Sequence, residues 1–344
     1  MGKPIDKKCC SLSRRDFLRG LSGAAAAALI GGSCESSKTS SSSPENPPAG
    51  PAALPPRNRL ANAFVNQAGQ PLLVCVTGTD FATMLAAGIS RLGGLNRLIG
   101  AGQDVLVKPN CNAPEPYPGI SDAKSVAAII QEVKKVTTGT VSAGDQGYYP
   151  FSFGFAGMGP AVEQAGGRIL TLGNTYDVRR NTWASNVPDF KVYTDVYDAP
   201  VIINTCVIKR HHTAIFSCAL KNNVGAVAGP GAVLTRNFLH YQSQDFMSVV
   251  ADIAGVVNPD LNIVDARSVL TEGGPSYQDG VVVDAHKLIL CGDIVATDVY
   301  CAGILESLDD GFTAASAMST VDYAVFLGLG TSDLSQVEII EISA

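Results

Sequence analysis

Cationic and imidazole side chains gather at the end of one apolar run of this chain. The run that begins near Ile203 continues into Lys209, Arg210, His211 and His212, which include two of the chain's four histidines. Imidazole acts as a general base, a general acid or a metal ligand near neutral pH. Because adjacent residues of a strand point to opposite faces, we expect only one of the two imidazoles to enter a site. Lys209, His211 and His212 are therefore the candidate catalytic residues.

Two more lysines stand beside amides and glycine-rich turns. Lys108 ends an apolar run and precedes a Pro-Asn pair, whereas Lys221 precedes an Asn-Asn pair and a nearby glycine. A cation, an amide and glycine backbone are groups that hold a carboxylate or a phosphate. The alternative is that these lysines pair with Asp265, Asp293 and Asp298 in an internal ion network. The predicted binding site for an anionic small molecule or cofactor consists of Lys108, Asn110, Lys221, Asn222 and Gly225.

A divalent metal is the candidate cofactor. His240 is the remaining histidine of the polar segment 205–240, and Asp265 ends an apolar run. Together with His211 or His212 they would supply two imidazoles and a carboxylate, an open metal site with positions left for substrate. The competing interpretation is that His240 packs beneath the loop before it. No C-x-x-C pair occurs in the sequence, so neither an iron–sulfur cluster nor a structural zinc site is predicted.

Short apolar runs alternate with helical patterns from residue 72 onward. We expect strands over 72–77, 104–108, 140–144, 168–172, 199–204, 261–265, 287–291 and 337–342, and helices over 80–98, 122–136, 158–165, 243–257 and 293–308. This alternation favours an α/β fold with a mainly parallel sheet and helices on both faces, with 205–240 as a long functional insertion. Ligands of such sheets gather at the carboxyl ends of the strands. The side chains expected to converge on one cleft there are Lys108, Lys209, His211, Lys221 and Asp265.

In their order and spacing these motifs resemble a prokaryotic family known as domain of unknown function 362, from about residue 100 to the end of the chain. The resemblance rests on seven short matches: Lys108-Pro109-Asn110, Lys209 with His211, Leu220-Lys221-Asn222 with Gly225, His240, the strand from Pro259 to Asp265, Gly273-Gly274-Pro275, and the stretch from Asp293 to Asp298. Where this chain has Lys-Arg-His-His, the family more often has Lys-Thr-His. Some members are fused to ferredoxin-type iron–sulfur modules; no such module is visible here, so no redox role is carried over. The family has no settled activity, so the resemblance implies a site and not a reaction.

The first 33 residues have the pattern of a twin-arginine signal peptide, which addresses folded cargo to export. Residues 13–18, Ser-Arg-Arg-Asp-Phe-Leu, precede a Gly- and Ala-rich apolar run that is too short to span a bilayer. Residues 29–34, Leu-Ile-Gly-Gly-Ser-Cys, resemble a lipoprotein cleavage box, so we expect lipidation of Cys34 and a position at the periplasmic face of the membrane. The alternative is cleavage near Gly32 and a soluble periplasmic protein.

Residues 34–65 are rich in Ser, Pro and Ala, which predicts a flexible tether, and residues 66–344 are expected to form a single α/β domain. Residues 1–33 carry six of the 25 Lys and Arg and two of the 31 Asp and Glu, so their removal changes the formal net charge from −6 to −10. This charge argues against nucleic acid as a partner, and membrane contact is expected through the lipid alone. The expected partners are an anionic small molecule and the twin-arginine export machinery.

Two classes of function fit these features. One is an enzyme of redox-linked metabolism that is metal-assisted through its histidines and Asp265. The other is a non-catalytic periplasmic lipoprotein that binds or assembles a cofactor. A flexible tether suits both classes, and export as folded cargo favours a cofactor that is inserted in the cytoplasm.

Overall fold

The computed structural model describes residues 53–111, 113–146, 157–170, 172–179, 189–228 and 245–344. Its contacts divide the chain into two units, residues 1–50 and 51–344, and the described residues all belong to the second. The predicted signal peptide, Cys34 and His240 therefore lie outside the described residues. Within them, no helix combines the length and the apolar character that crossing a membrane requires.

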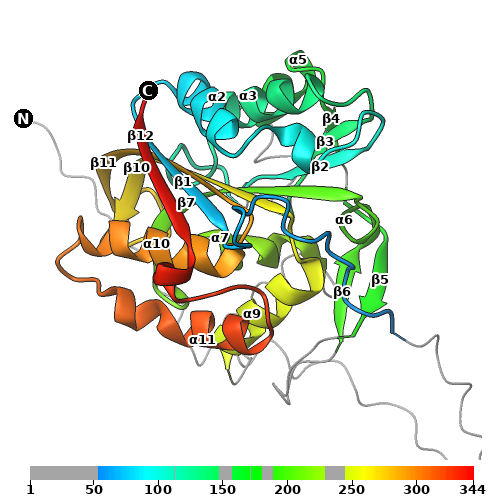
Figure 1. Cartoon of the computed structure of the whole chain (residues 1–344). Coiled ribbons are helices and arrows are strands. Elements are labelled where there is room, and N and C mark those ends of the chain that lie inside the picture. Colours follow the sequence, from blue (N-terminus) through cyan, green and yellow to red (C-terminus); the bar gives the residue numbers. More distant parts are fainter. Residues whose placement is uncertain (1–52, 112, 147–156, 171, 180–188, 229–244) are drawn as a thin grey trace, which may run out of the picture. The chain divides into compact units, whose positions relative to one another are not determined.

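A mainly parallel sheet forms the middle layer of the domain (Figure 1). Its strands lie in the order β12-β1-β11-β10-β7-β2-β3-β4, and β8 pairs with β7. Neighbours are parallel except where β11 pairs with β1 and β10, and where β8 pairs with β7. A separate small sheet has the order β5-β6-β9. The bounds are β1 Leu72–Thr77, β2 Val105–Lys108, β3 Val141–Ala143, β4 Arg168–Ile169, β5 Thr175–Val178, β6 Phe190–Tyr193, β7 Val201–His211, β8 Ile215–Ser217, β9 Val227–Ala228, β10 Leu261–Thr271, β11 Val281–Cys291 and β12 Glu338–Ser343.

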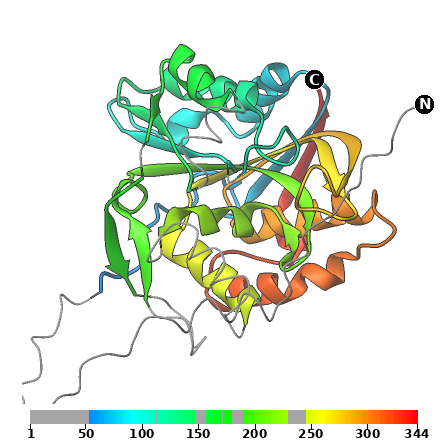
Figure 2. The ribbon, with the colours of Figure 1, turned by 180° about the vertical axis from the view of Figure 1, so that it is seen from behind.

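Helices cover both faces of the large sheet, which confirms the predicted fold class (Figures 1 and 2). One face packs against α2 (Phe81–Arg91), α3 (Ala123–Lys134) and α5 (Met158–Gln164). The other packs against α7 (Ala219–Asn222), α9 (Phe246–Val257), α10 (Ile294–Glu306) and α11 (Met318–Phe326). The helices α2, α3, α9 and α10 each begin at an aspartate whose carboxylate accepts from a backbone N–H of the first turn. The short helical segments are η1 Leu95–Arg97, α6 Thr194–Tyr197, η2 Asn223–Ala226, η3 Ala314–Ala317 and η4 Leu334–Gln336.

Every strand and helix expected from the sequence is present, with shifted ends. The strand β7 continues to His211, β10 continues to Thr271, and β11 already begins at Val281. Charged residues interrupt the apolar runs of these strands, but pairing resumes beyond them, with shifts of register in β10. The elements β5, β6, α6 and α11 were not expected. In its described part, up to residue 228, the predicted insertion consists of the end of β7 followed by β8, α7, η2 and β9. These residues belong to the fold and are not an added loop.

The predicted boundary between tether and domain at residues 65 and 66 is wrong, because residues 53–65 pack against the domain. The guanidinium of Arg57 forms a buried ion pair of 2.9 Å with Asp260. It also donates to the carbonyl oxygens of Ala199, Pro200 and Asn258, at the amino ends of β7 and β10. Phe64 is fully buried. The Pro-rich composition of residues 53–65 does not indicate this packing, because the contacts come from a few side chains and not from a periodic pattern.

Candidate functional site

Lys108 is the last residue of β2 and the centre of a buried polar cluster at the carboxyl ends of β2 and β3. Its ammonium forms an ion pair of 2.7 Å with Asp145 Oδ1. The same Nζ donates to the carbonyl oxygens of Asn222, at 2.7 Å, and of Pro109, at 3.3 Å. An ammonium has three donors, so all three are used inside the protein. Lys108 therefore holds Asp145 and the end of α7 in place.

Asp145 follows β3 and is a site residue that the sequence reasoning missed. Its Oδ2 accepts from the backbone N–H of Cys111 at 2.7 Å. Burial raises the pKa of Asp145, and the neighbouring Lys108 opposes that shift. A Cβ at Gly225 would overlap Asp145 Oδ1, so the glycine predicted as a ligand residue is needed for close packing against the ion pair. The signal that could have identified Asp145 is a carboxylate directly after a short buried run, the same signal that identified Asp265.

Three asparagines carry hydrogen bonds from α7 across the sheet. Asn222 Nδ2 donates to Asn204 Oδ1 at 2.7 Å, and Asn204 Nδ2 donates to Asn262 Oδ1 at 2.9 Å. Asn262 Nδ2 then donates to the carbonyl oxygen of Cys291 at 3.2 Å. Lys108, Asn204 and Asn262 are partners in register on three neighbouring strands, so they form one polar row. Asn204 and Asn262 were also missed, although an asparagine inside each of two apolar runs was a visible signal.

Lys209 and Asp265 lie on the opposite face of the sheet, beside α3. Lys209 Nζ donates to the carbonyl oxygen of Gly119 at 2.5 Å, and Asp265 Oδ1 accepts from the hydroxyl of Tyr117 at 2.9 Å. Strand residues alternate between the two faces, and Lys108 belongs to the set on the α7 face. The structure therefore brings Lys108, Asn222 and Gly225 together but places Lys209 and Asp265 in a second cluster. The expected single cleft is divided between the two faces.

The carboxylate of Asp265 is fully engaged by neighbouring donors. Its Oδ1 accepts from Tyr117 and from Arg267 Nε at 3.0 Å, and its Oδ2 accepts from Ser125 and from Arg267 Nη2, both at 2.8 Å. These bonds occupy the lone pairs that a metal would use. Among the described residues, no group of three or more His, Cys, Asp or Glu side chains is arranged to hold a metal. The remaining predicted ligand, His240, lies outside the described residues.

The two adjacent histidines differ in burial. His211 is 6% exposed, and its Nδ1 accepts from the backbone N–H groups of Thr213 and Ala214, both at 3.1 Å. Neutral His211 therefore carries its proton on Nε2. His212 is exposed, and its ring stacks on that of His211 with the ring centroids 4.9 Å apart. The two rings do not point to opposite faces of the sheet as expected, because β7 ends at His211 and the chain turns there toward β8.

Lys221 lies on α7, close to the polar row. It is 9% exposed, and its Nζ lies 5.6 Å from the centroid of the Phe246 ring, a cation–π contact. The start of α7 is held by Asp298 of α10, whose Oδ1 accepts from the N–H of Ala219 at 2.7 Å. Burial raises the pKa of Asp298 to about 7. The sequence left the direction of Asp298 open, and the structure turns it inward onto α7.

Three findings relate this chain to known proteins. A family model described as "Domain of unknown function (DUF362)" matches residues 105–303, which include the predicted site residues from Lys108 to Asp265. A thylakoid-associated protein of Synechocystis sp. is 25% identical over 225 residues, a match that covers 60% of this chain. It spans 66% of that relative's length. The lactate racemase apoprotein from Thermoanaerobacterium thermosaccharolyticum aligns with a TM-score of 0.38 and 11% identity over 67% of this chain and 58% of its own.

Proposed function

The chain belongs to the family described as domain of unknown function 362, and we propose that it binds an anionic small molecule or cofactor at the carboxyl ends of β2 and β3, beside α7. Lys221 supports this proposal together with the amides of Asn110 and Asn222, while Lys108, paired with Asp145, holds the surrounding backbone in place. The proposal assigns recognition of the negative charge to Lys221, which lies on α7 next to Asn222. Backbone and amide groups around it would orient the ligand.

The observation that carries the proposal is a buried acceptor without a partner. Asn110 is 5% exposed, and within the described part of the chain its Oδ1 has no hydrogen-bond partner. Its backbone is fixed, because its N–H donates to Ser121 Oγ at 2.9 Å. A buried amide oxygen without a partner costs about 1–3 kcal/mol, and a ligand that donates to it recovers that cost. The ligand class is therefore an anion that also carries a hydroxyl or amino donor.

Thermal-shift measurements with small hydroxy acids, amino acids and sugar phosphates test this proposal. At least one of these compounds should raise the melting temperature of the wild type. The increase should be lost in Lys221→Met and reduced in Asn110→Ala. The matched control is Lys191→Met, which removes an exposed lysine that pairs with Asp177 and should leave the increase intact. If no compound raises the melting temperature of the wild type, or if all three variants respond equally, the proposal is wrong.

Among the described residues, the geometry favours the non-catalytic binding function over a metal-assisted enzyme. The donors of Lys108 are all used, and the oxygens of Asp265 are all engaged. Neither group therefore has a hydrogen-bonding position left for a substrate or a metal in this state. Elemental analysis of the wild type and His240→Ala, purified in parallel, distinguishes the two functions. Metal that is bound by the wild type and lost from the variant would favour the enzyme.

We also propose that the protein is exported by the twin-arginine route and lipidated at Cys34. The support is the order of Arg14-Arg15, an apolar run and a cysteine-terminated box at the start of the sequence. Cell fractionation of the wild type, Arg14→Lys/Arg15→Lys and Cys34→Ser tests both steps. The double lysine variant should remain in the cytoplasm, and Cys34→Ser should lose the acyl mass and leave the membrane fraction. Membrane-bound Cys34→Ser would contradict lipidation at this residue.

A further inference from the structure

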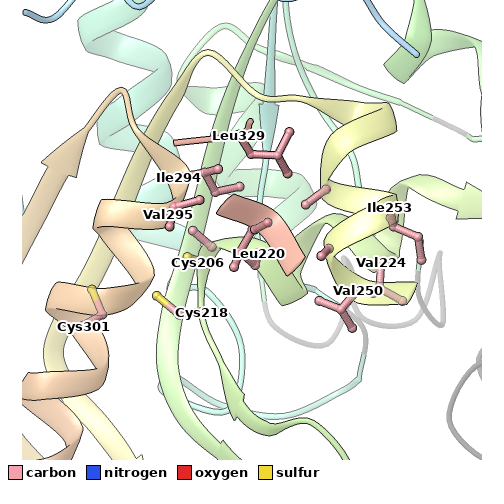
Figure 3. Packing of buried hydrophobic residues seen from close by; sticks show 14 of the residues in the cluster. Cys206, Cys218, Leu220, Val224, Val250, Ile253, Ile294, Val295, Cys301 and Leu329 are labelled. Atoms are coloured by element: carbon pink, nitrogen blue, oxygen red, sulfur yellow. The ribbon is translucent and has the colours of Figure 1, made fainter. Parts of the chain in front are cut away.

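Three cysteine thiols meet in the core of the domain (Figure 3). Cys206 lies on β7, Cys218 directly precedes α7, and Cys301 lies on α10. All three belong to one cluster of buried residues. Burial raises the pKa of all three thiols, which keeps them protonated. All six cysteines of the described residues are free, and each is 1% exposed or less, so an oxidant in solution cannot reach them in the folded protein.

The same cysteines are vulnerable in the unfolded chain. Cys206 and Cys218 are close in sequence, as are Cys291 and Cys301. Short loops close readily, so an oxidant joins these pairs before more distant ones. The unfolded chain therefore has two local disulfides within easy reach, while the folded chain has none of its six described thiols exposed.

One of these two disulfides is incompatible with the native fold. Cys291 ends β11, and its Sγ accepts from the backbone N–H of Asp293, the N-cap of α10. From that cap, α10 carries Cys301 about 12 Å along its axis, at a rise of about 1.5 Å per residue. A disulfide needs Cα atoms within about 7 Å of each other. A Cys291–Cys301 disulfide therefore requires α10 to unwind.

We infer that the domain has a redox-sensitive folding step: it reaches its native state only while Cys291 and Cys301 are reduced, and the folded core then shields both thiols. With oxidised glutathione as the oxidant, two thiols of the unfolded chain lose their hydrogens and form one S–S bond, while the glutathione disulfide is reduced to two thiols. Folding must therefore precede contact with a disulfide oxidant. The folding step follows from the positions of the thiols alone, whereas its meaning for export rests on the proposed twin-arginine route.

Refolding under two redox conditions tests the inference. The protein is the full chain with Cys9, Cys10 and Cys34 replaced by Ser, unfolded in urea with reductant and then refolded in reduced or in oxidised glutathione. The native melting temperature should return in reduced glutathione and be lost in oxidised glutathione. Peptide mapping of the oxidised sample should find the Cys291–Cys301 link, and the native protein should react with Ellman's reagent only after urea is added. Equal recovery in both conditions, or an oxidised sample without this link, would overturn the inference.

Variants at the two cysteines distinguish misfolding caused by the Cys291–Cys301 disulfide from misfolding with other causes. Cys291→Ala and Cys301→Ala each break the same link, so each should recover several-fold more native protein in oxidised glutathione than the parent. Cys111→Ala is the matched control, because it removes another buried thiol and should fail like the parent. If neither Cys291→Ala nor Cys301→Ala improves the recovery, the proposal that this disulfide blocks folding is contradicted. The result is independent of whether the signal directs export, so the two proposals can fail separately.

Discussion

The substitution Lys108→Met should destabilise the domain by about 3–5 kcal/mol, because it leaves the Asp145 carboxylate buried without its cation. Methionine fills a similar volume, so the loss comes from charge and hydrogen bonding and not from a cavity. The carbonyl oxygens of Asn222 and Pro109 also lose their donor. The double variant Lys108→Met/Asp145→Asn should recover most of the loss, because it leaves no buried charge at either position. The amide oxygen introduced at position 145 can still accept from the backbone N–H of Cys111.

Urea unfolding of the wild type, Lys108→Met, Asp145→Asn and the double variant measures the interaction free energy between Lys108 and Asp145. The pH dependence of the unfolding free energy provides an independent check. Burial already raises the pKa of Asp145, and removal of Lys108 removes the main influence that lowers it. The folded Lys108→Met variant then binds a proton more tightly than its unfolded chain, so its unfolding free energy should increase as the pH falls toward the ordinary pKa of a carboxyl group. A double variant no more stable than Lys108→Met, or a loss that is independent of pH, would refute the reasoning.

Three further predictions concern the same cluster. Gly225→Ala should destabilise the domain by about 3 kcal/mol because its Cβ overlaps the buried ion pair, whereas Gly102→Ala, where a Cβ meets no atom within 4 Å, should be nearly neutral in the same urea titration. Because the pKa of Asp298 is raised to about 7, its share of the unfolding free energy falls as the pH rises from about 4 to about 7, and Asp298→Asn should flatten that slope in pH-dependent melts. Asn204→Ala should cost about 2–4 kcal/mol because Asn262 Oδ1 loses its donor; a loss below about 1 kcal/mol in urea unfolding would show that the polar row contributes little.

The order of strands and helices could be predicted from the sequence because each element has a local signal. Apolar runs mark β1, β2 and β10, and Asp122 and Asp293 stand directly before the first turns of their helices. The pairing of the strands has no such signal. The antiparallel strand β11, which lies between β1 and β10, and the small sheet of β5, β6 and β9 depend on contacts between segments that are separate in the sequence.

The candidate site was predictable only in part, because the position of a residue at a strand end does not specify its face. Lys108 and Lys209 both follow apolar runs, yet their side chains lie on opposite faces of the sheet. A difference of one residue in register moves a side chain from one face to the other, and the register of β7 against β2 cannot be derived from composition. Asp145 was missed for a related reason, since its role depends on the distant Lys108.

The segment formed by α7 and η2 is the rigid part of the proposed site, because three other elements and one residue beyond β3 hold it. Asp298 of α10 accepts from the backbone N–H of Ala219, the first residue of α7, and Asn204 of β7 accepts from the side chain of Asn222. Lys108 of β2 donates to the carbonyl oxygen of Asn222, and the N–H of Gln146, beyond β3, donates to the carbonyl oxygen of Gly225 at 2.9 Å. A four-residue helix has little stability of its own, so these contacts fix its geometry. Lys221 is therefore presented from a backbone that is already ordered, and a ligand that binds there has little backbone entropy left to overcome.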